Sequence, residues 1–485
     1  MPSGLPLTNR VCLARAARIV LTLLSLSAGC AHYVSVPLSA SRTLDDLEAR
    51  RLDAPAVGEF LKAGRAVEAW PLSTWNLRQL SLAAFFYSPS LDVARAQWQS
   101  AQGGVITAGG RPNPTLSAGE GFDATTPATQ ISPWMPQVSL ALPIEMAGKR
   151  GVRVDRARAQ AEVAHFNVLT TAWQVRRAVR EAYVELFAAT AIDSLQSTRQ
   201  SLAAEVVRIL EAQRAVGDVA VFDVTQARLA LADARIAALS AQQRHVEARS
   251  ALAAAVGVST VALDATRFTF DEFARPAPLV PDREVRRVAL LQRADVRAAL
   301  ADYDVSQANL KLEIRNQYPD LTLGPGYQLD QTDVKWSLSL SLPVALLNRN
   351  QGPIAEARAR REEMAARFLA LQARVIVEVD RAVAASALTR LQVSVADSIT
   401  TSLGRQQRST EAGYRAGELS KLQLLGVQLE LVSAALARID VVSRAQLTVG
   451  ALEDAMQSTF DLEPWIIATP NRGGATTLPA KDQPS

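Results

Sequence analysis

The stretch Arg-Ala-Val-Gly-Asp-Val-Ala at residues 214–220 decides the fold, because a near copy of its setting, Tyr-Arg-Ala-Gly-Glu-Leu-Ser, returns at residues 414–420. Each copy lies between two long, alanine-rich amphipathic stretches. Glycine readily adopts the positive backbone angle that the end of a helix needs. We therefore predict that Gly217 and Gly417 form the turns of two helical hairpins and that the chain is a tandem duplication.

The stretches leading to these turns predict unusually long helices. Roughly sixty residues precede each glycine, which corresponds to about 90 Å of unbroken helix. Apolar residues recur at coiled-coil spacing in four places: Val175, Val179, Ala182, Leu186 and Ala189; Leu195, Leu202, Val206 and Ile209; Leu229, Ala232, Ile236 and Leu239; Leu429, Val432, Leu436 and Ile439. A ring of helices around water and a long antiparallel coiled coil solvated on all sides both fit this periodicity.

Strand signals occur once per repeat, before each long helix. Residues 137–145 and 334–346 alternate apolar side chains with small or polar ones, and each follows a proline- and glycine-rich passage that we predict to be its partner strand. The predicted hairpins cover about 114–143 and 320–343. Strands of roughly ten residues with one apolar face and aromatic ends fit a transmembrane barrel.

A soluble, half-buried hairpin would show the same alternation. However, a lone two-stranded hairpin is marginal in water, and the sequence offers no other strands with which to form a soluble sheet. The smallest common membrane barrel has about eight strands, more than one chain provides. We therefore predict a barrel that several chains share.

The N-terminus carries an export signal. Arg10, Arg15 and Arg18 precede the apolar run 19–26, and small residues lie directly before Cys30. This layout resembles a bacterial lipoprotein signal, which implies acylation at Cys30, although Ser27 replaces the usual branched aliphatic residue. An ordinary signal peptide cleaved nearby and an uncleaved anchor are the alternatives, but the apolar run is too short to span a bilayer.

The composition argues against catalysis and nucleic-acid binding. The 485 residues have a net charge of only +4, with arginines spread along the predicted helices. The two cysteines, Cys12 and Cys30, leave no thiol pair downstream, and the three histidines (His32, His165 and His245) are isolated from one another. No GxSxG elbow or phosphate loop occurs, and residues 148–151 lack the glycine spacing of such a loop. We expect no enzyme, no cofactor and no metal site.

The predicted organisation follows from these signals. A signal peptide (1–29) precedes a lipid-anchored linker (30–76), the first repeat (77–256), a connector (257–288), the second repeat (289–460) and a tail (461–485) that we expect to be disordered.

The passages LPIEMAGKRGVR (142–153) and LPVALLNRNQGPIAEA (342–357) resemble the openings of the descending helices in the TolC family of outer-membrane efflux proteins, nearest its heavy-metal (CzcC-like) branch. The resemblance covers nearly the whole mature chain. It implies a homotrimer in which each chain gives four strands to one twelve-stranded membrane barrel and its long helices to a periplasmic tunnel, so the fold is mixed helical and membrane-strand. An inner-membrane pump of the RND class and a periplasmic adaptor would be its partners, beside outer-membrane lipid. The family motif residues are Gly148, Lys149, Arg150, Asn350, Gln351 and Gly352.

The resemblance also assigns the two glycine turns to the periplasmic tip, where the tunnel narrows and the adaptor docks. The residues that it places there are Gly217, Asp218, Gly417, Glu418 and Lys421. Some family members carry two aspartates after the second turn, but residues 420–426 contain no carboxylate. Asp223 is a candidate acidic group at the tip, and a carboxylate that only stabilises the start of a helix is an equal alternative.

Together these patterns predict a passive outer-membrane duct of a tripartite exporter, with divalent heavy-metal cations as candidate cargo. A lipid-tethered periplasmic coiled-coil protein with a structural or signalling role is the alternative.

Overall fold

The computed structural model describes residues 33–63, 67, 69–124, 133–274, 282–330 and 333–457. The predicted signal peptide, the acylation site Cys30 and the predicted tail 461–485 lie outside the described residues. The chain divides into two units, residues 1–49 and 50–485. Within the described part of the smaller unit, the helix α2 (Ala40–Glu48) has no buried residue.

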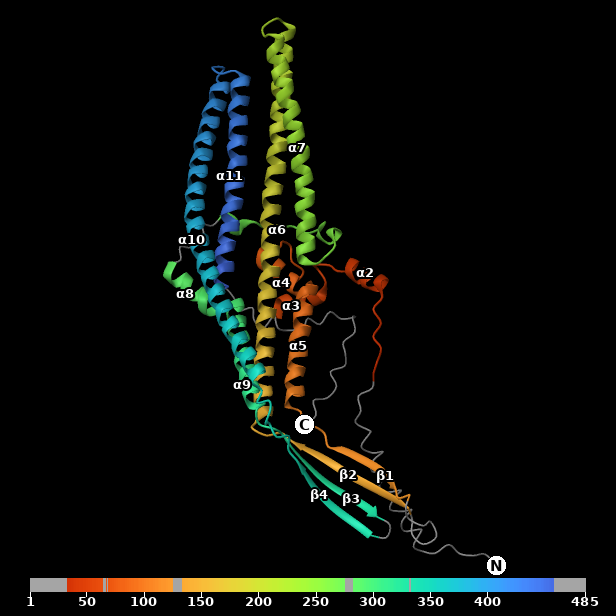
Figure 1. Cartoon of the computed structure of the whole chain (residues 1–485). Helices are drawn as coiled ribbons and strands as arrows, with labels where there is room; N and C mark the ends of the chain where they lie inside the picture. The colour runs from red at the N-terminus through yellow and green to blue at the C-terminus, as the bar shows by residue number, and fades with distance from the viewer. Residues whose placement is uncertain are drawn as a thin grey trace, which may run out of the picture. The chain divides into compact units, whose positions relative to one another are not determined.

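The larger unit shows the same order of elements twice: a helix, two strands and two long helices (Figure 1). The first set comprises α5 (Pro89–Gly109), β1 (Thr115–Phe122), β2 (Trp134–Ile144), α6 (Lys149–Ala215) and α7 (Val221–Val256). The second comprises α9 (Ala294–Arg315), β3 (Leu321–Asp330), β4 (Asp333–Ser341), α10 (Gln351–Arg415) and α11 (Lys421–Met456). Because β2 and β4 lead directly into α6 and α10, the strands lie at the ends of these helices remote from the glycine turns (Figure 1).

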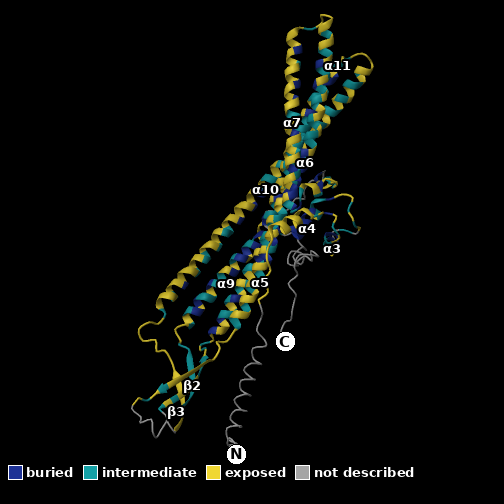
Figure 2. Cartoon of the chain, turned by 90° about the vertical axis from the view of Figure 1, so that its right-hand side faces the viewer, coloured by how far each residue is buried: buried dark blue, intermediate teal, exposed yellow. Residues whose placement is uncertain are grey.

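The main hydrophobic core packs short elements against one face of α6. They are α3 (Pro55–Ala63), α4 (Leu77–Tyr87) and the 3-10 turns η2 (Thr260–Leu263) and η3 (Asp271–Ala274). All residues of α4 from Leu80 to Tyr87 are buried, and α6 contributes Val179, Tyr183 and Leu186 (Figure 2). One face of α6 is therefore fixed in apolar surroundings, and its opposite face is left to polar side chains.

A smaller core lies along the second half, where α8 (Asp282–Gln292) packs on α10 and α11. Val285 and Ala289 of α8 meet Val375 and Val379 of α10. This core holds far fewer side chains than the one on α6, so most of α10 is accessible in the single chain.

The strands form one antiparallel sheet in the order β1-β2-β3-β4. The β2–β3 pairing joins the two sets of elements, with Val138 opposite Tyr327 and Leu142 opposite Leu323. The strands correspond to the two hairpins that the alternation predicts. Among the described residues β1 and β4 each pair on one side only, so the sheet has two open edges.

The apolar stripe predicted on residues 229–239 has a different role from its counterparts on α6. Leu231 and Ala234 pack against Ala203 and Val207 of α6, whereas Leu229, Ile236 and Leu239 are exposed. Two apolar stripes share α7, and the hairpin with α6 uses only one of them, so the other has no partner within the described chain. In the part of the chain that the structure describes, no helix is both long and apolar enough to cross a membrane.

Candidate functional site

The sheet exposes apolar side chains. On β4 the alternate residues Trp336, Leu338 and Leu340 are between two thirds and four fifths exposed. The intervening serines face glycines of β3, and Ser339 Oγ donates a hydrogen bond to the Gly324 carbonyl at 3.0 Å. A Cβ at Gly324 would overlap that hydroxyl, which explains the small residues on this side of the pair.

Aromatic pairs lie at the hairpin ends of both strand pairs. Phe122 is opposite Trp134 with ring centroids 4.9 Å apart, and Tyr327 is opposite Trp336 at 5.1 Å. Both contacts are edge-to-face, a favourable geometry for aromatic rings. Amphipathic aromatic rings at strand ends are typical of membrane–water interfaces.

The turn from β2 into α6 depends on Gly148 and Lys149. Gly148 has φ +65°, and it is directly followed by Lys149, which is buried. Lys149 Nζ contacts Asp320 Oδ1 at 2.9 Å, and the Met146 backbone N–H donates to the same oxygen at 3.0 Å. Burial alone would raise the pKa of Asp320, but these two hydrogen bonds and the charges of Lys149 and Arg153 outweigh it, so the pKa is lowered.

Arginines join this turn to the neighbouring helices. Arg150 Nε donates to the Gly109 carbonyl at 2.6 Å, and Arg153 Nη2 donates to the Gly110 carbonyl at 3.3 Å. Arg153 also forms an ion pair with Glu145, whose hydrogen bond raises the pKa of Arg153. On the other side, Arg315 at the end of α9 donates to the Ala147 carbonyl. The predicted motif therefore fixes the ends of α5, α6 and α9 to one another.

The turn from β4 into α10 also contains a residue with positive φ that connects neighbouring helices, but here the residue is an asparagine instead of a glycine. Asn350 has φ +60°, and its Nδ2 donates to the backbone carbonyl and to Oε2 of Glu313, both at 2.8 Å. Gln351 and Gly352 are exposed, and a Cβ at Gly352 would meet no atom within 4 Å. Among the second set of motif residues, Asn350 is thus the one that joins helices.

The two glycine turns end the long hairpins as predicted from their sequences. Gly217 has φ +86° and Gly417 has φ +79°. The N–H groups of Asp218 and Glu418 donate to the carbonyls of Gln213 and Gly413 at 3.0 and 2.9 Å, while the two carboxylate side chains are exposed. Both tips therefore have the same backbone geometry.

The side chains of the two tips differ. Asp223 Oδ2 accepts a hydrogen bond from the Ala220 N–H at 3.2 Å, which is the helix-start role. The equivalent turn uses Ser420 and Gln423 in a reciprocal capping box. Lys421 Nζ lies 5.3 Å from the centre of the Tyr414 ring, a cation–π distance.

The first tip also exposes apolar side chains that the second lacks. Val216, Val221 and Phe222 are each more than half exposed. At the second tip Leu419 packs over Gly413, where a Cβ would lie 2.9 Å from its Cδ1. The first tip therefore presents the more apolar surface.

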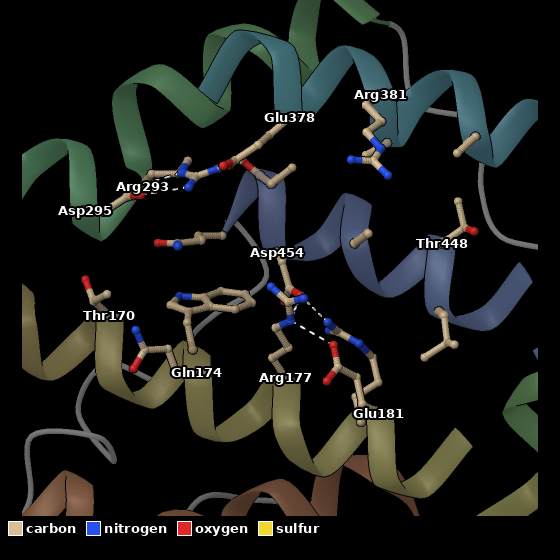
Figure 3. A pocket seen from close by; sticks show the side chains of 18 of the residues that line it. Thr170, Gln174, Arg177, Glu181, Arg293, Asp295, Glu378, Arg381, Thr448 and Asp454 are labelled. Carbon is tan, nitrogen blue, oxygen red and sulfur yellow. Dashed lines mark hydrogen bonds and ion pairs between the residues drawn. The ribbon is translucent and has the colours of Figure 1, made fainter. Parts of the chain in front are cut away.

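A cavity of about 930 Å³ lies among α6, α10, α11 and the start of α9. Nine of its nineteen lining residues are charged, including Arg177, Glu181, Arg381 and Glu378 (Figure 3). The hydrogen bond to Glu181 raises the pKa of Arg177. The α6 side chains that line the cavity lie on the face of α6 opposite the main hydrophobic core, so this face of α6 is polar.

Arg180 also lines the cavity, and it is the most buried arginine there, with 5% of its side chain exposed. It forms ion pairs with Asp454 and Glu453 on α11. Burial raises the pKa of Asp454 even though the charge and hydrogen bond of Arg180 act in the opposite direction. A Cβ at Gly450 would overlap Arg180, so that glycine makes room for the guanidinium.

Sequence reasoning missed the Arg180 cluster because its members are some 270 residues apart and belong to no local motif. In the described residues no group of three His, Cys, Asp or Glu side chains could hold a metal ion.

The chain is similar in sequence to outer-membrane efflux proteins. The profile of the family described as outer membrane efflux protein matches residues 83–258 and 285–456. The cobalt-zinc-cadmium resistance protein CzcC of Cupriavidus metallidurans is 26% identical over 362 residues, covering 73% of this chain and 83% of CzcC.

Solved structures share the fold. The outer membrane protein VceC of Vibrio cholerae has a TM-score of 0.63 at 22% identity, covering 80% of this chain and 99% of VceC. The CmeC outer membrane channel of Campylobacter jejuni has a TM-score of 0.63 at 16% identity, covering 88% of this chain and 94% of CmeC.

The chain combines a four-stranded sheet that exposes apolar side chains with two helices of 67 and 65 residues, each paired with a shorter helix. The chain belongs to the outer membrane efflux protein family, the TolC family.

Proposed function

We propose that the protein is a passive, non-enzymatic outer-membrane duct of a tripartite exporter. The observation that carries this proposal is the open four-stranded sheet with exposed apolar side chains. In water, two open edges and an apolar face would favour aggregation. In a bilayer the same face would contact lipid, and the open edges would pair with further strands.

The assembly that we propose is a homotrimer with a shared twelve-stranded barrel. Four strands are too few to close a membrane barrel, so β4 of one chain would pair with β1 of the next. The helices support a closed ring: α7 and α10 form opposite edges of the array α7-α6-α11-α10. Both edges expose apolar side chains at helical spacing, namely Leu229, Ile236, Leu239 and Val246 on α7, and Leu388, Leu391, Val395 and Ile399 on α10.

The two sets of elements would be a duplication, as the repeated turn sequences indicate, and their helices would enclose an aqueous tunnel. Arg177 and Glu181, on the polar face of α6, would line that tunnel. A wet, charged wall fits a conduit that carries polar solutes without a dedicated binding site.

The glycine tips would form the periplasmic end, where an adaptor and an RND pump engage. The exposed Val216, Val221 and Phe222 favour the first tip as the principal apolar contact for the adaptor. Asp218, Glu418 and Lys421 would adjust docking or opening. Asp223 would act by holding the start of α7.

Divalent heavy-metal cations are the cargo that we propose, on the basis of the similarity to CzcC. The cations would be selected by the pump. Acylation of Cys30 would add a tether, and intact-mass measurement of the mature protein would test it.

Reconstitution tests the duct directly. Purified full-length protein should run as a heat-modifiable trimer and give single-channel conductance in planar bilayers. A chain that never conducts would instead support the lipid-tethered coiled-coil alternative.

A deletion strain tests the cargo. Loss of the gene should lower tolerance to zinc, cobalt, nickel or copper more than tolerance to common antibiotics. Unchanged metal tolerance would remove the metal proposal and leave the duct intact.

A further inference from the structure

A band of cationic side chains lies where the strands meet the helices. We call it the junction layer and define it as residues 109–114, 145–153, 313–320 and 342–350. Each of the four junctions contributes at least one cation, and the members are Arg111, Lys149, Arg150, Arg153, Arg315 and Arg349. The carboxylates of the layer are Glu145, Glu313 and Asp320. Cations therefore outnumber carboxylates two to one.

The carboxylates of the junction layer are already engaged inside the protein. Glu145 pairs with Arg153, and Asp320 pairs with Lys149. Glu313 accepts a hydrogen bond from Asn350. Two of the three carboxylates are therefore neutralised by ion pairs, and the layer as defined keeps a net charge of +3.

Three arginines carry this excess at the surface: Arg111, Arg150 and Arg349. Among the described residues, Arg111 and Arg349 have no hydrogen-bond or ion-pair partner, and Arg150 has only the Gly109 carbonyl. Because Arg150 contacts Gly109, it lies beside the segment that carries Arg111. Arg349 belongs to the junction that Asn350 fixes to the end of α9.

Apolar and aromatic side chains accompany these arginines. The segment 342–347 between β4 and Arg349 exposes Leu342, Val344, Leu346 and Leu347, the last completely. Tyr318, between α9 and β3, is 59% exposed. Exposed cations directly beside exposed apolar chains and a tyrosine match the amphipathic chemistry of a membrane–water interface.

We propose that the junction layer binds the phosphate headgroups of anionic phospholipids in the membrane leaflet that faces the helices. This proposal rests on the proposed insertion of the strands into a bilayer. Arg111, Arg150 and Arg349 contact headgroup phosphates, and the apolar segment 342–347 contacts the upper acyl chains. Guanidinium groups suit this task because they bind phosphate oxygens in pairs. The lipid belt holds the helical tunnel at a fixed height relative to the membrane.

Lipid retention by the full-length protein tests the proposal. The wild-type protein and the triple variant Arg111→Gln, Arg150→Gln, Arg349→Gln are reconstituted in nanodiscs of phosphatidylcholine containing a minor fraction of phosphatidylglycerol. They are then released into mild detergent, and the bound lipid is counted by native mass spectrometry. The matched control, Arg235→Gln, Arg405→Gln, Arg408→Gln, removes equal charge from exposed positions of α7 and α10 remote from the layer.

We expect the wild-type protein and the matched control to retain phosphatidylglycerol selectively and the junction variant to lose that selectivity. Each arginine near an anionic surface contributes about fivefold in affinity, and the preference should weaken with added salt. Lysine in place of the three arginines should restore most of it.

Several results would overturn the inference. Equal selectivity in the junction variant, or equal loss in the matched control, would show that these arginines do not form a lipid site. Dissociated trimers with unchanged lipid selectivity would assign them to a contact between copies of the chain. Wild-type protein that conducts in bilayers but shows no lipid preference would remove the inference while leaving the duct in place. Failure of the wild-type protein to insert would overturn the duct itself, and with it the inference.

Discussion

The helices α6 and α10 occupy matching places in the two halves, yet they have very different surroundings. They are 67 and 65 residues long, and each ends two residues before the glycine of its tip, α6 at Ala215 and α10 at Arg415. Fifteen residues of α6 are buried, against four of α10. The difference arises because α6 lies between α7 and α11 and supports the main core, whereas α10 lies at an edge of the array.

This difference shows that a repeated sequence need not give a repeated environment. The helix α6 has neighbours on both sides within the chain, whereas α7 and α10, at the two edges of the array, leave apolar side chains exposed. In the proposed trimer another copy would cover these edges, so stability should arise within the chain at α6 and between chains at α10.

The largest effect is expected from charging the exposed edge of α10. The pair Leu391→Glu, Val395→Glu removes two apolar contacts and places charges in the proposed interface, at a cost of at least ~4 kcal/mol per interface. Trimers should dissociate in native mass spectrometry. The control Ser197→Glu, Ser201→Glu places the same charges on exposed positions of α6 and should leave trimers intact. Intact trimers in both variants would show that α10 is not an interface.

A smaller but still large effect is expected at Arg180. The substitution Arg180→Met leaves Asp454 without its buried partner, at a cost of about 3 kcal/mol, whereas Glu453 keeps its ion pair with Arg176. The residue 200 positions later, Asp380, pairs with Arg286 in an exposed position, and Asp380→Asn should cost less than about 1 kcal/mol. Chemical denaturation measures the loss of stability in each variant. Equal shifts of the unfolding midpoint would show that Arg180 on α6 is no more important for stability than Asp380 on α10.

A third, smaller effect is expected when valine replaces Gly217 or Gly417 at the tips, because only backbone strain opposes the substitution. No atom lies within 4 Å of a Cβ at Gly217 or Gly417, so valine there costs only the positive φ, about 1–2 kcal/mol. Efflux should fall while trimers persist. The control Gly404→Ala, within α10 and equally open, should export normally. Full export with valine at both tips would refute their assignment as the docking and opening elements.

The smallest effect is expected at the β2–α6 junction, through pH. Because the folded state lowers the pKa of Asp320 below its usual 3.8, ionised Asp320 stabilises the fold above that value. The contribution is lost as the pH falls through the lowered folded pKa. Thermal denaturation of Asp320→Asn should therefore differ from wild type at neutral pH and converge with it in acid. A difference that is independent of pH would contradict the role of this ionised carboxylate.

The sequence predicted the elements that depend on local patterns. Alternation in residues 334–346 and the glycines of the tips depend on nearest neighbours along the chain, and the structure shows a strand over Asp333–Ser341 and turns at the glycines. The resemblance to the TolC family pointed to residues 148–150, and the structure shows that Arg150 contacts Gly109 of α5 and that Lys149 contacts Asp320.

Contacts between residues far apart in the chain could not be predicted from the sequence. Nothing near Gly450 predicts that Arg180 fills the space above it, because the two residues meet only when α6 and α11 lie side by side. The apolar stripe Leu229, Ile236 and Leu239 was predicted from its spacing, but the spacing does not reveal that the hairpin with α6 leaves this stripe exposed. The acidic role considered for Asp223 illustrates the same limit, since its hydrogen bond to Ala220 appears only in the folded turn.

The two open edges of the sheet also have a consequence for biogenesis. In the proposed trimer the edge strands β1 and β4 would gain their second partners only when three copies meet, so maturation should be kinetically of higher order in chain concentration. Before that, each copy would present open edges to which unrelated strands could add. We therefore expect that slow assembly of the proposed trimer would give aggregated chains rather than stable monomers.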